Sequence, residues 1–176
     1  MRFEETALRG AFVIHQERHV DERGFFARTW SREEFVAHDL ATEIVHVNTS
    51  FNRTRGTLRG MHWQVPPFAE AKVVRCTAGA IYDVMVDLRS QSPTYTRHVG
   101  VTLSADEGTM VYCPPGFAHG FITLTDATEV SYLMTQAYAP DHARGARWDD
   151  QLFDISWPMD PVVISDRDRT YPDLRP

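Results

Sequence analysis

Residues 108–123 read Gly108-Thr-Met-Val-Tyr-Cys-Pro114-Pro-Gly116-Phe-Ala-His119-Gly-Phe-Ile-Thr123. A run rich in β-forming residues stands on each side of a Pro-Pro-Gly break, and this order predicts two short strands joined by a turn. The same alternation of short β-rich runs with Gly, Pro and Asp turns recurs along the chain. The stretch therefore indicates an all-β fold.

The rest of the sequence extends this pattern. We predict strands at residues 11–16, 43–49, 57–62, 72–77, 80–88, 94–103, 109–113, 120–124, 129–135 and 154–157. Helix signals are scarce, and the clearest starts at Ser31, which forms a capping box with Glu34. Many short strands with almost no helix favour an antiparallel sandwich or barrel. An α/β fold would need alternating helical segments, which the sequence lacks.

The apolar run at residues 80–88 shows how such a strand divides its side chains between two faces. We expect one set to face a core and the other to face a mixed surface or a cavity. The core set is Tyr82, Val84, Val86 and Leu88, and the other set is Ile81, Asp83, Met85 and Asp87.

Composition bounds the class of protein. The chain has 176 residues without repeats or linkers, which predicts one domain over residues 1–176. A net charge of −6 argues against nucleic-acid partners, although arginines can still converge on a small anionic ligand. No apolar run approaches the roughly 20 residues of a membrane span. The first residues lack the apolar core of a signal peptide, so we expect a cytoplasmic protein without membrane partners.

Lys72 is the single lysine of the chain, against seventeen arginines, and it lies inside an apolar stretch. A lysine is a compact point charge, whereas a guanidinium is a rigid planar fork. The alternative is a surface lysine retained by chance in an arginine-rich chain. Its neighbours His62 and Arg59 favour a site that requires an ammonium group.

Two segments fit the motifs of the cupins. Residues 108–123 match the second cupin motif, G-x5-P-x-G-x2-H-x3-N, with Thr123 in place of the final Asn. Residues 56–62 open like the first motif, G-x5-H-x-H-x3,4-E-x6-G, but Gln64 replaces the second His and the Glu is displaced to Glu70. The resemblance implies an all-β, cupin-type double-stranded β-helix, or jelly roll, with short peripheral helices and a site in the barrel mouth.

In cupins the two motifs supply three His and one Glu to a metal. Here His62 and His119 alone remain at matching positions, and two imidazoles make a poor site for iron or manganese. We therefore expect no metal and no cofactor. For His119 the alternative is a histidine that simply packs after a Pro-Gly turn.

Segments between residues 21 and 168 resemble the dTDP-4-dehydrorhamnose 3,5-epimerases. They include Asp21-Glu-Arg-Gly-Phe-Phe26, Val47-Asn-Thr-Ser50, Gly56 to Gln64, Ala71-Lys-Val-Val-Arg75, Gly79 to Arg89, Pro115 to Phe121, Glu129-Val-Ser-Tyr132, Trp148-Asp-Asp150 and Ile164 to Asp168. Such enzymes invert the carbons on either side of the ketone in a nucleotide-linked 4-keto-6-deoxy hexose. The resemblance implies a homodimeric isomerase of carbohydrate biosynthesis, best matched to dTDP-4-dehydro-6-deoxy-D-glucose.

The resemblance also assigns four chemical roles. His62 matches the base, and Asp168 matches the carboxylate that fixes its tautomer. Lys72 matches the cation at the enolate oxygen, and Tyr132 matches the acid on the opposite face. Without the resemblance, Tyr132 would be interpreted as an inward-facing core aromatic.

Further residues match substrate-binding positions. Arg59 is the candidate for the pyrophosphate, because a guanidinium can engage two oxygens at once. Arg23 matches an arginine that reaches the ligand from an exchanged N-terminal strand of the partner subunit, and Tyr138 matches an aromatic near the base. The other matches are Phe26, Asn48, Gln64 and His119.

Three positions depart from the family pattern, and they leave alternatives open. Arg28 replaces an acid, His46 replaces a Gln, and Trp63 replaces a Tyr or Phe. We therefore expect dTDP as the nucleotide, with CDP and GDP as alternatives. Inversion at C3 alone, at C5 alone or at both carbons is left open. Other classes are a non-catalytic cupin that binds sugar nucleotides and a metal-dependent cupin, which Gln64 opposes.

Overall fold

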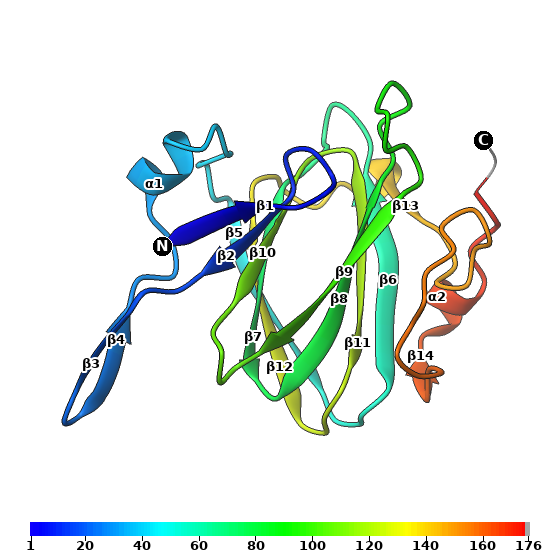
Figure 1. The fold of residues 1–176 in the computed structure, drawn as a ribbon. Helices are drawn as coiled ribbons and strands as arrows, with labels where there is room; N and C mark the ends of the chain where they lie inside the picture. Colours follow the sequence, from blue (N-terminus) through cyan, green and yellow to red (C-terminus); the bar gives the residue numbers. More distant parts are fainter. Residues whose placement is uncertain (175–176) are drawn as a thin grey trace.

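The computed structural model describes residues 1–174, and most of its strands form two sheets that face each other (Figure 1). The first sheet contains β1 (Arg2–Glu5), β2 (Phe12–His15), β5 (His46–Asn52), β7 (Lys72–Ala78), β10 (Met110–Cys113) and β12 (Thr128–Met134). The second contains β6 (Thr57–Gln64), β8 (Ala80–Asp87), β9 (His98–Ser104), β11 (Phe117–Thr123), β13 (Ala143–Gly145) and β14 (Val163–Ile164).

The order of the strands is that of a jelly roll. The first sheet runs β1-β2-β10-β7-β12-β5 and the second runs β13-β6-β11-β8-β9, with β14 pairing in parallel with β6. Most neighbours are distant in sequence, so the chain passes repeatedly between the two sheets. The cupin-type all-β fold predicted from the sequence is confirmed.

Each predicted strand except 154–157 overlaps an observed one. In that segment Asp154 has a φ of 47°, which breaks an extended run, and the Trp157 indole donates a hydrogen bond to the carbonyl of Trp148 at 2.9 Å. The alternating apolar residues there pack onto a sheet without pairing with it, so the strand prediction was wrong. The sequence also missed β1, β13, β14 and a hairpin of β3 (Arg18–Asp21) and β4 (Gly24–Ala27).

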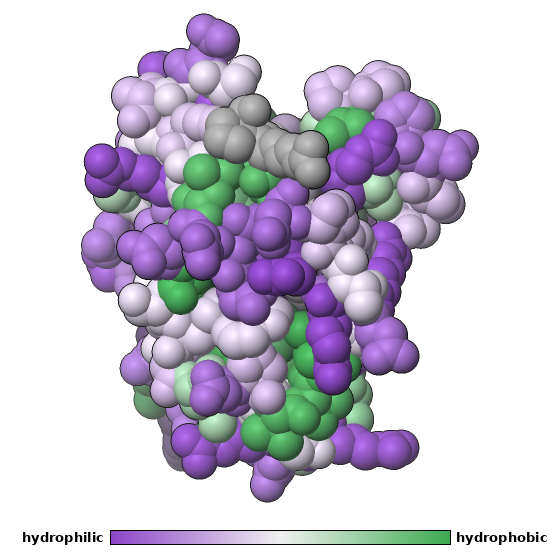
Figure 2. Space-filling model, turned by 90° about the vertical axis from the view of Figure 1, so that its right-hand side faces the viewer, coloured by the Kyte–Doolittle hydropathy of each residue, from purple (hydrophilic) through white to green (hydrophobic). Residues whose placement is uncertain are grey.

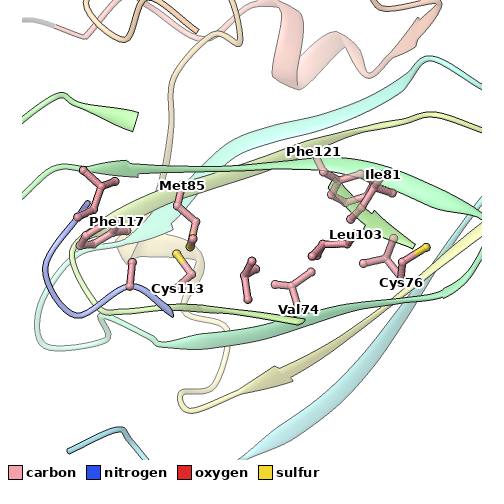
Figure 3. Packing of buried hydrophobic residues seen from close by; sticks show 12 residues of the cluster. Val74, Cys76, Ile81, Met85, Leu103, Cys113, Phe117 and Phe121 are labelled. Atoms are coloured by element: carbon pink, nitrogen blue, oxygen red, sulfur yellow. The ribbon is translucent and has the colours of Figure 1, made fainter. Parts of the chain in front are cut away.

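The space between the sheets holds the main core. Side chains from both sheets point toward one another there, including Val74, Met85, Cys113 and Phe121 (Figure 3). Met85 belongs to the set expected to face a surface or cavity, yet it is fully buried. Core residues are concentrated on β7 to β11, which leaves the interior beside β5, β6 and β12 for a cavity.

Parts of both outer faces are covered as well. On the second sheet, Val84 and Val86 pack with Phe153 and Trp157 from the C-terminal segment. Figure 2 views the molecule from that side and shows mostly hydrophilic residues broken by a few separate apolar areas. The strand at residues 80–88 is thus buried on both faces, because the C-terminal segment carries the polar surface in its place.

A short helix covers the first sheet. The helix α1 (Arg32–Val36) places Phe35 against Tyr112 and Ile14 of the outer face. Ser31 caps it by accepting a hydrogen bond from the Glu34 amide at 3.4 Å, as predicted. The reciprocal half of the capping box is replaced, because the Glu34 carboxylate binds the N-terminal amine of Met1 at 2.7 Å instead.

The hairpin β3–β4 projects away from the two sheets (Figure 1). Its apolar side chains are open to solvent, with Val20 77% and Phe26 71% exposed. No helix among residues 1–174 is long and apolar enough to cross a membrane.

Candidate active site

Two glycines bring β6 and β11 unusually close. A Cβ on Gly60, whose φ is 135°, would lie 2.5 Å from the Cα of Gly120. The two strands could not come this close if larger residues stood at these positions. The pairing places His62 directly opposite His119. The two histidines that survive from the cupin motifs therefore lie side by side at one end of the barrel interior.

His62 is bound to a buried carboxylate. Its Nε2 lies 2.7 Å from Oδ1 of Asp168, which sits on the one-turn helix α2 (Asp166–Arg169) and is 4% exposed. The side chain of Ser165 caps this helix by accepting from the amide of Asp168 at 3.1 Å. The amide of Gly60 donates to the second carboxylate oxygen at 3.3 Å. The aspartate is therefore fixed from both sides while it orients the imidazole.

The charge state of Asp168 follows from these contacts. Burial acts to raise the pKa of its carboxyl, but the hydrogen bond and charge of His62 and the Gly60 amide outweigh burial. The pKa therefore lies below its ordinary value of 3.8. The carboxylate is ionised at neutral pH and can stabilise an imidazolium.

Lys72 is buried, with a second carboxylate beside it. Its ammonium lies 2.8 Å from Oε1 of Glu70 and donates to the carbonyl of His62 at 3.0 Å. The other oxygen of Glu70 accepts the amide of Gln64 at 3.1 Å. The ion pair offsets part of the desolvation cost of both groups, and Lys72 lines the cavity.

Tyr132 approaches from the other sheet. Its hydroxyl lies 2.9 Å from the hydroxyl of Ser50 on the adjacent strand β5. Burial raises the pKa of Tyr132 well above its ordinary value of 10, and the Ser50 hydrogen bond and the charge of Arg59 oppose that rise only in part. The phenol is therefore protonated at neutral pH.

His119 forms a second histidine–carboxylate pair. Its Nε2 lies 2.7 Å from Oδ2 of Asp83, and both side chains are almost completely buried. The other oxygen of Asp83 is buried without a hydrogen-bond partner in the described residues. His119 is thus held in one orientation at the wall of the cavity.

Most of these side chains line one cavity of about 670 Å³. It brings together predicted residues of both sheets and of α2: Asn48, Arg59, His62, Lys72, His119, Tyr132 and Asp168. The guanidinium of Arg59 donates from Nε to the Asn52 side chain at 2.7 Å. That contact holds one edge of the guanidinium and leaves its terminal nitrogens for a ligand. The volume is that of a small-molecule site.

A second cavity of about 310 Å³ adjoins the first and shares His62, Lys72 and Asn48 with it. Tyr138 lines it and is 62% exposed. Two of the departing positions, His46 and Trp63, also line this cavity. The third, Arg28, lies elsewhere and binds Glu34 at 3.3 Å.

Gln64 lines the second cavity, but its amide is already engaged. The amide nitrogen donates to the carbonyls of Phe68 and Ala137 at 2.9 and 3.2 Å. The amide oxygen accepts from Ala139 at 2.6 Å. The residue therefore holds two loops at the cavity wall, and a substrate contact by Gln64 remains a prediction.

Arg23 and Phe26 lie far from this group in the chain's own fold, because both belong to the projecting hairpin (Figure 1). The Arg23 guanidinium binds Asp21 of the same turn, and Phe26 lines a separate surface hollow. Within one chain the structure does not bring them to the cavity.

Sequence reasoning missed three residues of the site. Arg167 lines both cavities, Glu70 neutralises Lys72, and Ser50 binds Tyr132. Arg167 precedes Asp168 in a short helix, and that adjacency was the available signal. In the described part of the chain, no three His, Cys, Asp or Glu side chains gather as metal ligands.

Comparison with known proteins agrees with this arrangement. Residues 5–176 match the family model of dTDP-4-dehydrorhamnose 3,5-epimerase. The enzyme of that name from Sinorhizobium fredii is 39% identical over 175 residues, which cover 99% of this chain and 90% of the relative. The crystal structure of the Bacillus anthracis enzyme with TDP and PPi bound has a TM-score of 0.95 at 38% identity, covering 98% of this chain and 99% of that one.

A second kind of relative has the same fold. The structure of a 3'-monoepimerase from Streptomyces bikiniensis, in complex with dTDP-quinovose, has a TM-score of 0.87 at 34% identity. The match covers 95% of this chain and 85% of that one. The family model and the near full-length relatives together show that this chain belongs to the dTDP-4-dehydrorhamnose 3,5-epimerase family and is a carbohydrate epimerase.

Proposed function

We propose that this chain converts dTDP-4-dehydro-6-deoxy-D-glucose to dTDP-4-dehydro-L-rhamnose by proton transfer at C3 and C5. One observation carries the proposal. His62 belongs to the second sheet, with Asp168 bound to it from α2, and Tyr132 belongs to the first sheet; all three line the same cavity. A base and an acid on facing walls are what inversion at carbon requires, since one proton leaves from one face and another is added to the opposite face.

The first half of the reaction breaks a C–H bond next to the 4-ketone. The hydrogen bond to Asp168 keeps a proton on Nε2 of His62 and leaves a lone pair on Nδ1 to take the proton from carbon. Charge then develops on the 4-oxygen as the enolate forms. The Lys72 ammonium stabilises that charge, because the side chain is buried and its charge is only weakly screened by water.

The second half forms a new C–H bond. Tyr132 donates its phenolic proton to the carbon from the face opposite His62, and the ketone is restored. His62 then loses its extra proton to solvent, and Tyr132 regains one. The sequence repeats at the other carbon, so the reaction balances without any oxidant or cofactor.

The remaining side chains suit the rest of the substrate. Arg59 and Arg167 line the first cavity and offer guanidinium groups to the diphosphate. His119 faces the sugar as a fixed hydrogen-bonding group. Asn48 and the exposed ring of Tyr138 border the second cavity, which we assign to the nucleoside.

We further propose a homodimer in which the hairpin β3–β4 serves the partner's site. The exposed apolar residues of the hairpin support this, as do Val47 and Phe51 on the edge strand β5, which are 67% and 55% exposed. Burial of such residues favours association. Arg23 and Phe26 would then reach a ligand in the partner subunit. Cytoplasmic location and the single domain stay predictions.

One alternative has specific support. The similarity to a 3'-monoepimerase favours inversion at C3 alone as the second candidate. His46 and Trp63, which differ from the family pattern, line the second cavity. They leave CDP and GDP as alternative nucleotides.

The test is incubation with dTDP-4-dehydro-6-deoxy-D-glucose in D2O, with the label located by NMR. Deuterium at both C3 and C5 in an L-configured product is the expected result. Label confined to C3 selects the monoepimerase. If no carbon is labelled while the CDP or GDP analogue is, the nucleotide assignment is wrong, and a folded protein that labels none of them is a binding protein.

A further inference from the structure

The proposed reaction leaves Tyr132 without its proton after each inversion. A phenolate at this position is unfavourable, because burial is the main influence on the Tyr132 hydroxyl and it favours the neutral form. The enzyme therefore needs a route by which a proton returns to the phenolic oxygen. The hydrogen-bond partners of that oxygen determine the route.

Ser50 provides such a partner. Its Oγ lies 2.9 Å from the Tyr132 hydroxyl, and among residues 1–174 this is the one hydrogen bond that the phenol makes. In the pairing of β5 with β12, Tyr132 stands opposite Asn48 and Val130 stands opposite Ser50. Ser50 is thus the diagonal neighbour of Tyr132, within reach of a long side chain on the same sheet face.

Ser50 and Tyr132 face the same cavity. Both residues are half-buried, and both line the cavity into which the substrate enters. A hydroxyl both donates and accepts a hydrogen bond, so it can pass a proton in either direction. Ser50 can therefore pass a proton between the cavity and the phenolic oxygen to which it is hydrogen-bonded.

We propose that Ser50 is a positioning and proton-relay residue for Tyr132, an assignment that rests on the proposed function. When Tyr132 has given its proton to carbon, the Ser50 O–H transfers its proton to the phenolate oxygen. Ser50 regains a proton from cavity water at the same time. The proton that His62 releases to solvent balances the one that enters through Ser50.

In this proposal Ser50 takes no part in breaking the C–H bond. Ser50→Ala removes the relay and leaves His62, Asp168 and Lys72 in place. Ser50→Thr keeps a hydroxyl, and a β-branched residue suits a strand. The two variants therefore differ in whether a hydroxyl is present, and both keep a small side chain.

The experiment measures two rates in D2O with dTDP-4-dehydro-6-deoxy-D-glucose. One is deuterium uptake into recovered substrate, which reports proton removal by His62, and the other is product formation, which reports proton delivery by Tyr132. For Ser50→Ala we expect uptake near the wild-type rate and product formation lower by about tenfold or more, since general acids contribute about 10²–10⁴-fold. Ser50→Thr should recover most product formation. Retained uptake also shows that the alanine variant is folded.

Tyr132→Phe distinguishes failure of this inference from failure of the proposed function. If Tyr132→Phe loses product while Ser50→Ala keeps the wild-type ratio of product to uptake, Ser50 is no relay and the function stands. If Ser50→Ala and Ser50→Thr lose both rates equally, Ser50 has a structural role only and the inference is overturned. If Tyr132→Phe forms product at the wild-type rate, the proposed acid is wrong and the inference fails with it.

Discussion

His62 and His119 lie opposite each other on β6 and β11, and each places Nε2 at 2.7 Å from a buried carboxylate oxygen. The two pairs differ in access. The His62 side chain is 41% exposed toward the cavity, whereas that of His119 is 6% exposed. The more open imidazole suits exchange of a proton with substrate and solvent, and the enclosed one suits a fixed contact.

Asp168→Asn should lower kcat by about 10²–10⁴-fold with little change in KM. The amide keeps the shape of the side chain but loses the charge that stabilises the imidazolium of His62. Steady-state kinetics measure the effect. Asp149→Asn, at an exposed carboxylate paired with Arg147, is the matched control and should keep wild-type kinetics. Wild-type kcat in Asp168→Asn would show that the pair is not the base.

The same aspartate makes stability depend on pH. Its pKa is lowered on folding, so the folded state binds fewer protons than the unfolded state between the lowered value and the ordinary value of 3.8. The stabilisation is complete above the ordinary value and is lost as pH falls through the lowered one. Urea unfolding from pH 6 to pH 3 should therefore show a weaker acid dependence in Asp168→Asn. If the loss of stability at acid pH were the same in both proteins, other carboxylates would be responsible for it.

Lys72→Met should destabilise the fold by about 3–5 kcal/mol, because it leaves the Glu70 carboxylate buried without its partner. Adding Glu70→Gln should restore most of that loss, since glutamine can still accept the amide of Gln64. Neither the single nor the double variant should form product, because both lack the ammonium. Urea unfolding and product assays are the measurements. A double variant as unstable as the single one, or one that turns over substrate, contradicts the assignment.

Arg59→Met should weaken dTDP binding, because a hydrogen bond to a charged group contributes about 1.5–3 kcal/mol, which is roughly 10–150-fold in Kd. Arg55→Met is the control, since Arg55 is exposed and lines neither cavity. Calorimetric titration with dTDP compares the two. Equal affinities would remove Arg59 from the diphosphate site.

The exchanged hairpin predicts complementation between two defective chains. A mixed dimer of Arg23→Ala and His62→Ala chains contains one site with an intact His62 and an intact Arg23 from the partner. Mixing two inactive variants after unfolding and refolding should therefore recover activity. If the hairpin serves its own chain, no mixed dimer contains a complete site and the mixture stays inactive.

The sequence pattern predicted strands well where a strand is buried on one face or is bounded by turns. The Pro-Pro-Gly turn before His119 and the strands on either side of it are as predicted. The alternation of Ile155 and Trp157 misled, because apolar residues that pack onto a sheet from a loop repeat like those of a strand. The hairpin β3–β4 was missed because its side chains face solvent and show no inward periodicity.

The site was harder to predict because its contacts join distant residues. His62 and Asp168 are 106 positions apart, and Ser50 and Tyr132 are 82 apart, so no local pattern links either pair. The family resemblance supplied the first pair and was silent on the second. Glu70 stands two residues from Lys72, yet the sequence could not show that both are buried and face each other.

The central claim is that His62 removes a proton from carbon and Tyr132 delivers a different proton from the opposite wall. The most direct test compares deuterium uptake into dTDP-4-dehydro-6-deoxy-D-glucose with product formation in His62→Ala and Tyr132→Phe. The account predicts that His62→Ala loses both, while Tyr132→Phe keeps uptake and loses product. Wild-type uptake in a folded His62→Ala protein would contradict it.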